Sequence, residues 1–193
     1  FSGAVIPNLR LYGNTTLQKI AGFGIDDIGG DLTVLGTEAN PTAFRVQHDN
    51  DSYNASFNYA GRLRGDGHLV CTPIGLGAGV AKLPRLGLSG DNSRFVGTLE
   101  VTADATTREA LPMFDPSDGT RTNNVTLEVA SSTALGGALP TFDAQALRLG
   151  WSSVLKVLCD ATLAENRGLS VSDSPCIDVA KDTTFEVRER TTL

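Results

Sequence analysis

The sequence contains few of the residues that most catalytic and metal sites use. Its 193 residues include two histidines, three cysteines and one methionine, and aromatic residues make up 6%. His48 and His68 are the available imidazole bases, and neither belongs to a nucleophile motif such as Gly-x-Ser-x-Gly. No two cysteines form the close pair that zinc sites use. We therefore predict no catalytic residue, no metal site and no cofactor, and expect a protein that is not an enzyme.

Long apolar runs and basic clusters are also missing. No segment approaches the roughly 18–20 apolar residues that cross a bilayer. The N-terminal FSGAVIPNLRLYG lacks the regions of a signal peptide. The formal charge is −6, and the 16 basic residues are scattered singly. Because phosphate contacts dominate nucleic-acid affinity, we expect neither a nucleic-acid partner nor a membrane partner.

The cysteines give an odd count. Cys71, Cys159 and Cys176 lie in a chain long enough to fold without disulfide staples. One interpretation is a bridge between Cys159 and Cys176 in an exported protein. We favour the other, in which buried cysteines stay as free thiols.

Alternation of apolar and polar residues with a period of two is the main positive signal. Phe95, Leu99 and Val101 fall on one face of 94–103, and glycine- and aspartate-rich turns such as DDIGGD and LSGDN separate the alternating runs. We predict one all-β domain over 1–193, an antiparallel β-sandwich of jelly-roll-like topology with long loops. Residues 1–30 are a candidate N-terminal arm or edge segment. The strand candidates are 32–35, 43–46, 53–59, 68–74, 94–103, 124–131 and 183–190.

The segment ALRLGWSSVLKVLCDATLAEN, 146–166, fits two secondary structures. A helix would place five apolar side chains in one stripe: Leu147, Trp151, Val154, Leu155 and Leu158. A strand pattern fits more positions, and Gly150 disfavours a helix, so we predict one bent strand or two. The repeated TLEV at 98–101 and 126–129 is interpreted as coincidence, because no sustained repeat accompanies it.

Several segments resemble binding sites in part. QHDNDSYN (47–54) is oxygen-rich, as calcium loops are, but lacks the EF-hand pattern, so we favour a solvated hairpin tip. PIGLGAGVAKLP (73–84) lacks the spacing of a phosphate loop, and we predict a flexible loop or β-bulge. Four glycosylation sequons, at Asn14, Asn50, Asn54 and Asn124, matter only in a glycosylating compartment.

The tripeptide Arg64-Gly65-Asp66 is the most suggestive short motif. It resembles the adhesion tripeptide that integrins recognise in matrix proteins and on some viral capsids. That resemblance implies a receptor-binding role for Arg64, Gly65 and Asp66 at the tip of a projecting loop. The same letters are ordinary hairpin punctuation, and we favour this interpretation as a simple turn.

A family resemblance completes the sequence-based interpretation. The segment GNTTLQKIAGFGIDDIGGDLTVLGTEA (13–39) resembles strand segments of phage tail fibres and other virion β-proteins. The whole chain is similar in size and rhythm to single jelly-roll capsid subunits, although it has no basic N-terminal arm. This resemblance implies a structural virion protein, a capsid, projecting or decorating subunit that self-assembles.

The expected partners are copies of itself, other virion subunits and a host-surface receptor or glycan, in a virion or extracellular location. The alternative is an exported adhesin or pilus subunit, or a carbohydrate-binding β-sandwich module. A small carbohydrate-active enzyme with paired carboxylates is a third, weaker hypothesis.

Overall fold

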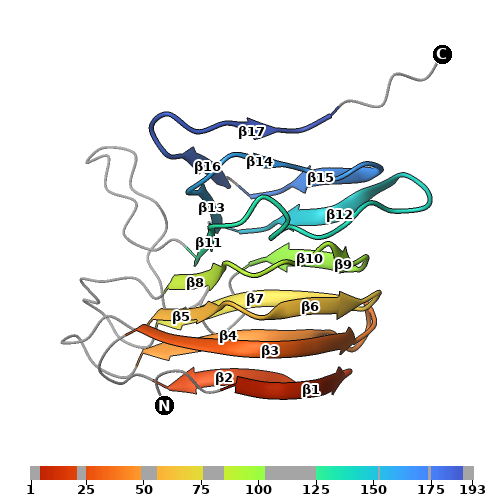
Figure 1. Ribbon diagram of the computed structural model, residues 1–193, viewed down its shortest axis with the longest axis vertical. Coiled ribbons are helices and arrows are strands. Elements are labelled where there is room, and N and C mark those ends of the chain that lie inside the picture. The colour runs from red at the N-terminus through yellow and green to blue at the C-terminus, as the bar shows by residue number, and fades with distance from the viewer. Residues whose placement is uncertain are drawn as a thin grey trace.

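The computed structural model describes residues 5–20, 25–48, 56–75, 85–102, 125–151, 153–173 and 175–188. These residues contain β-strands and no helix, so none of them forms a helix that could span a membrane. The strands stack along the longest axis of the molecule, with β1 and β2 at one end and β16 and β17 at the other (Figure 1). The all-β part of the fold prediction is confirmed.

The strands have the following bounds: β1 (Val5–Tyr12), β2 (Thr16–Ile20), β3 (Ile25–Leu35), β4 (Thr42–His48), β5 (Ser56–Tyr59), β6 (Arg62–Gly65), β7 (His68–Gly75), β8 (Arg85–Leu88), β9 (Arg94–Phe95), β10 (Thr98–Val101), β11 (Val125–Val129), β12 (Asp143–Leu149), β13 (Ser153–Val157), β14 (Ala161–Thr162), β15 (Arg167–Val171), β16 (Cys176–Val179) and β17 (Phe185–Glu186).

The strands form three long sheets and one short one. Sheet A contains β1, the second half of β3, β6 and β9, and sheet B runs β2-β4-β7-β10-β12-β15. Sheet C contains the first half of β3, followed by β5, β8, β11, β13 and β16. The chain passes through sheets C, A and B in turn, and each such passage forms one coil of a β-solenoid. Strands β14 and β17 form a short pair. Each follows a strand of sheet C in the chain, at the stage at which the earlier coils enter sheet A.

Every recorded strand pair is parallel, so the prediction of an antiparallel jelly-roll sandwich is wrong. Alternation identifies a strand with one buried face but does not identify its partner. Parallel neighbouring strands usually need a long crossover connection, typically a helix. Because this sequence has short polar turns between its strands, it favoured the antiparallel prediction. In the solenoid, the other two sides of each coil provide the crossover.

Inward side chains form rows that run along the axis. A row on sheet B joins paired positions in successive coils, and a second row on sheet C does the same. These buried side chains exclude water and stabilise the stack in proportion to their apolar area. The sheet B row is Phe44, Cys71, Val101 and Leu149, and the sheet C row is Leu86, Leu127 and Leu155.

Glycines stack where the coils turn. At the corner from sheet A to sheet B, Gly36, Gly67 and Gly97 follow one another in successive coils. A Cβ atom on Gly97 would overlap the carbonyl oxygen of Gly67, and one on Gly67 would lie 2.7 Å from the amide nitrogen of Gly36. Backbones therefore approach too closely for any side chain at this corner. Gly30, Gly61 and Gly90 form a similar column at the corner from sheet C to sheet A.

Segment 130–142 interrupts sheet A, because no strand lies between β11 and β12. Arg167, on β15 in the following coil, is 2% exposed, and its guanidinium lies 5.9 Å from the ring centre of Phe95. It donates hydrogen bonds to the carbonyls of Gly97 (2.8 Å) and Ala146 (3.0 Å), with a longer contact to Gly137 (3.5 Å). A buried cation thus bridges the coils on either side of the interruption.

Other sequence predictions can be compared with this fold. The region 146–166 forms strands and not a helix, as predicted, but it contains the end of β12 together with β13 and β14, where one bent strand or two were predicted. All three cysteines are free, although only Cys71 is fully buried. Cys176 pairs with Val154 near the start of β13, whereas Cys159 follows the end of β13. A bridge between Cys159 and Cys176 therefore does not fit this register. The described strands form one stack, and β1 and β2 of the candidate arm are its first edge strands.

Candidate functional site

The Arg64-Gly65-Asp66 tripeptide lies at the corner between β6 and β7. It is not a hairpin, because β6 pairs with β3 and β9 whereas β7 pairs with β4 and β10. Gly65 has a φ of 95°, which favours glycine, and its carbonyl accepts a hydrogen bond from the amide of Val96. Asp66 is exposed. The tripeptide therefore follows the surface of the stack and does not project on a loop.

Arg64 already has an acidic partner. Its Nη2 lies 2.8 Å from Asp31 Oδ2, and Arg62 Nε lies 2.7 Å from Oδ1 of the same carboxylate. The Nε of Arg64 is buried and has no hydrogen-bond partner in the described part of the chain, while the side chain as a whole is 29% exposed. One carboxylate is thus held between two guanidinium groups on the outer face of sheet A.

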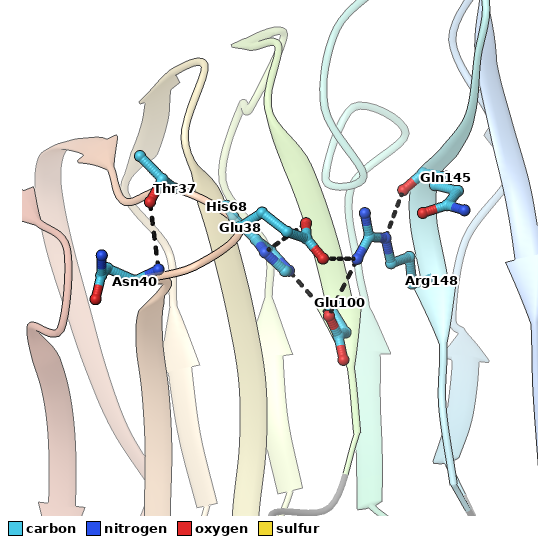
Figure 2. A network of polar contacts seen from close by, with 7 residues as sticks. All are labelled: Thr37, Glu38, Asn40, His68, Glu100, Gln145 and Arg148. Carbon is cyan, nitrogen blue, oxygen red and sulfur yellow. Dashed lines mark hydrogen bonds and ion pairs between the residues drawn. The ribbon is translucent and has the colours of Figure 1, made fainter.

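A second polar cluster begins at the same corner and crosses sheet B (Figure 2). In the loop after β3, the backbone amides of Thr37 and Asn40 each donate a hydrogen bond to the carbonyl of the other residue. This turn places Glu38 beside His68. His68 Nδ1 lies 3.3 Å from Glu38 Oε2, and its Nε2 lies 2.9 Å from Glu100 Oε2. We name Glu38, His68, Glu100 and Arg148 the sheet B network.

Arg148 completes the sheet B network. Its Nη1 donates to Glu38 Oε1 at 2.7 Å and lies 3.9 Å from Glu100 Oε2, while its Nε donates to the Gln145 carbonyl. The hydrogen bond from Arg148, and then its charge and that of His68, lower the pKa of Glu38 below its ordinary 4.5. The same hydrogen bond raises the pKa of Arg148. Arg148 thus lies close to the carboxylates of both Glu38 and Glu100.

The geometry limits what the sheet B network can do chemically. His68 Nε2 lies within hydrogen-bond distance of Glu100, its Nδ1 is buried without a hydrogen-bond partner among the described residues, and the side chain is only 7% exposed. Cys71 lies nearby on β7, and burial, with the charge of Glu100, raises the pKa of its thiol. A thiol in that state is a poor nucleophile. Within the described ranges, no group of three or more His, Cys, Asp or Glu side chains is placed to hold a metal ion.

The outer face of sheet A carries a row of arginines, which we name the arginine row: Arg10, Arg64 and Arg94. Register pairs Arg10 with Thr33, Thr33 with Arg64, and Arg64 with Arg94. Arg10 and Arg94 are exposed, and neither has an ion-pair partner among the residues that the structure describes. The row gathers scattered sequence positions on one face of an acidic protein.

Sequence reasoning identified only part of these sites. It singled out Arg64, Gly65, Asp66 and His68, but it missed the arginine row and the roles of Glu38, Glu100 and Arg148. These residues are far apart in the sequence, so their proximity can be recognised only when the parallel register is known.

The side chain of His48 and much of the segments 47–54 and 73–84 lie outside the described residues, as do the sequons at Asn50, Asn54 and Asn124. The sequon residue Asn14 is exposed in the turn after β1 and hydrogen-bonds Asn40.

Comparison with protein-family models, curated protein sequences and solved structures finds no match for the chain.

Proposed function

We propose that the chain is a non-enzymatic structural protein of a virus particle, a projecting or decorating component that self-associates and displays its outer surface. The long, stacked shape supports this role, because a solenoid extends along one axis and presents continuous side faces. The buried interior rows and the enclosed imidazole of His68 also favour a scaffold over a reaction centre. The jelly-roll capsid version of the hypothesis is not retained.

The end of the stack is the observation that carries this proposal. Ile177 pairs with buried Leu155, and Val179 pairs with buried Val157, so both continue the interior rows of sheet C. Each is nevertheless 38% exposed, and β16 has no further strand neighbour among the described residues. Exposed strand edges with apolar side chains favour pairing with another chain. A second copy stacked end to end would bury these side chains and lengthen the rod.

Particle length against concentration tests the proposal. Light scattering and electron microscopy of the purified chain should show rods that lengthen as concentration rises. The double variant Ile177→Lys/Val179→Lys should shorten them, because it places two charges in the end contact. Val96→Lys is the matched control, since Val96 is 39% exposed on a side face, and it should leave rod length unchanged. Wild-type protein that stays monomeric at every concentration would contradict self-assembly.

A second candidate is an exported adhesin, or a carbohydrate-binding protein built on this solenoid. The exposed arginines of sheet A and the surface position of Asp66 favour it. Attachment of integrin-bearing cells to the immobilised protein tests the tripeptide. Asp66→Glu should reduce attachment, whereas the exposed Asp178→Glu on sheet C should not. Unchanged attachment in both variants would exclude the receptor role of Arg64, Gly65 and Asp66.

A further inference from the structure

The arginine row has a regular spacing that fits a linear ligand. Neighbouring strands of a sheet lie about 4.8 Å apart, so the row from Arg10 across Thr33 and Arg64 to Arg94 spans about 14 Å. It crosses the strands and so follows the direction in which the coils stack. A straight, flat polymer laid along the molecule would meet these side chains one after another.

Contacts within the protein account for Arg64, which pairs with Asp31, but not for Arg10 or Arg94. Like charges on directly opposite positions of neighbouring strands destabilise a sheet, and Arg64 is paired in register with Arg94. On sheet C, by contrast, Arg85 and Lys156 both pair with Glu128. On sheet B, Arg148 pairs with Glu38 and contacts Glu100. On sheet A, Asp31 pairs with Arg62 and Arg64, but the exposed Arg10 and Arg94 have no acidic partner among the described residues.

The face already shows which anion it accepts. The carboxylate of Asp31 lies between Arg62 and Arg64, each of which contacts one of its oxygens. A planar guanidinium matches the geometry of a carboxylate, and a charge-assisted hydrogen bond is stronger than a neutral one. Arg10 and Arg94 present the same group on the same face. The exposed acid at the end of β6, Asp66, limits the positive region on the side toward sheet B.

Apolar side chains lie beside the row. Tyr12 is 60% exposed and stands two residues after Arg10 on β1, so both project from the outer face. Leu35 pairs with Tyr12, and Val96, which is 39% exposed, stands two residues after Arg94. The C–H face of a sugar ring packs against such surfaces, as it does on an aromatic ring, while its charged substituents need cations.

We infer that the outer face of sheet A binds a linear polysaccharide that carries carboxylates, a polyuronate, with its chain along the stacking axis. Its carboxylates contact Arg10 and Arg94, on either side of the Arg64–Asp31 pair, and a sugar ring packs on Tyr12. This inference rests on the second function proposed above, a surface-binding role, and names its ligand. It does not depend on rod formation, because one chain carries the whole row.

Equilibrium binding of labelled polygalacturonate oligomers to the monomeric full chain tests the inference. The wild type should bind them, should not bind neutral dextran, and should bind less tightly as salt increases. The double variant Arg10→Gln/Arg94→Gln should weaken binding at least about tenfold, since each lost charge-assisted hydrogen bond costs on the order of a tenfold loss. Tyr12→Ser should weaken it by a few-fold and leave the charge unchanged.

The matched control is Arg85→Gln/Lys156→Gln on sheet C, which changes the net charge by the same amount. It should alter binding less than about twofold, because screened charges on another face contribute little. Far-ultraviolet circular dichroism checks that each variant is folded.

Absence of wild-type binding, or an equal loss in both double variants, overturns the inference. Tighter, Arg10- and Arg94-dependent binding of heparin or duplex DNA also overturns it and assigns the face to a sulfated glycan or a polynucleotide. Cell attachment and rod length are measured separately, so failure of polyuronate binding can be distinguished from failure of either proposed function.

Discussion

Arg167 shows at the scale of one residue how the stack tolerates an interruption. Burial lowers the pKa of its guanidinium to about 10, so it remains charged at neutral pH. Among the described residues no carboxylate forms an ion pair with it, and backbone carbonyls from separate parts of the chain accept its hydrogen bonds. A single arginine therefore takes over contacts that strands make elsewhere in sheet A.

Removing this guanidinium should destabilise the whole molecule. Arg167→Met keeps much of the apolar stem but leaves the carbonyls of Gly97 and Ala146 without a donor, which should cost about 2–4 kcal/mol. Arg167→Lys should lose less, because one ammonium can still reach part of the set. Urea unfolding at neutral pH measures both variants. A change within experimental error for Arg167→Met would show that water satisfies these carbonyls as well as the guanidinium does.

Glu38 gives a prediction of pH dependence. Its pKa in the folded protein is lower than in the unfolded chain, so its contribution to stability is complete above pH 4.5 and is lost as pH falls through the folded pKa. The side chain is 68% exposed, so solvent screens the effect. In Arg148→Met, the carboxyl pKa should rise toward its ordinary value.

A titration of the Glu38 carboxyl followed by NMR measures this shift directly. Arg85→Met is the control, since it removes an outward arginine from another sheet and should leave the Glu38 pKa unchanged. A wild-type Glu38 that titrates at its ordinary value would contradict the hydrogen bond from Arg148.

At the scale of elements, the corner glycines fix the distance between coils. Sequence reasoning identified them as turn signals, which is correct locally. It did not show that Gly36, Gly67 and Gly97 lie above one another, because a turn signal carries no information about the neighbouring coil. The strands at 32–35, 43–46 and 68–74 could be predicted, because the alternation of apolar and polar residues is visible within the sequence of each strand.

A methyl group at this corner should be costly. In Gly97→Ala, the new Cβ would overlap the backbone carbonyl of Gly67, which cannot move without displacing its coil, so we expect a loss of about 2 kcal/mol or more. Gly87→Ala is the matched control on a strand of sheet C. There the nearest atom is the side-chain oxygen of Asn58, at 2.7 Å, and this side chain can shift at the cost of its hydrogen bond to Ser89, which should be smaller than the cost of displacing a backbone carbonyl. Thermal unfolding that lowers the midpoint equally in both variants would contradict the close approach at the corner.

At the scale of the whole molecule, the strands were predictable and their arrangement was not. The corner glycines Gly36, Gly67 and Gly97 are 31 and 30 residues apart, but the paired positions Leu99, Leu147 and Leu169 are separated by 48 and 22 residues, so the spacing is not kept along the chain. A spacing kept in only some of the coils is difficult to recognise as a sequence repeat. For the same reason, the arginine row and the sheet B network could not be predicted, although Arg64 and His68 had been noted individually.

The linear stack predicts a gradient of local stability. Each coil contacts mainly its two neighbours, and the end strands have a partner on one side only, so opening should begin at the ends. Hydrogen exchange followed by mass spectrometry should be slowest in β7, β8, β10 and β11, and fastest in β1, β2, β16 and β17.

Leu99→Ala removes a fully buried side chain from a central row at a cost of about 2–5 kcal/mol. Its effect on exchange should be largest in the adjacent strands β7 and β12 and should decrease toward both ends. Equal protection in all strands, lowered equally by this variant, would show instead that the coils unfold as one cooperative unit.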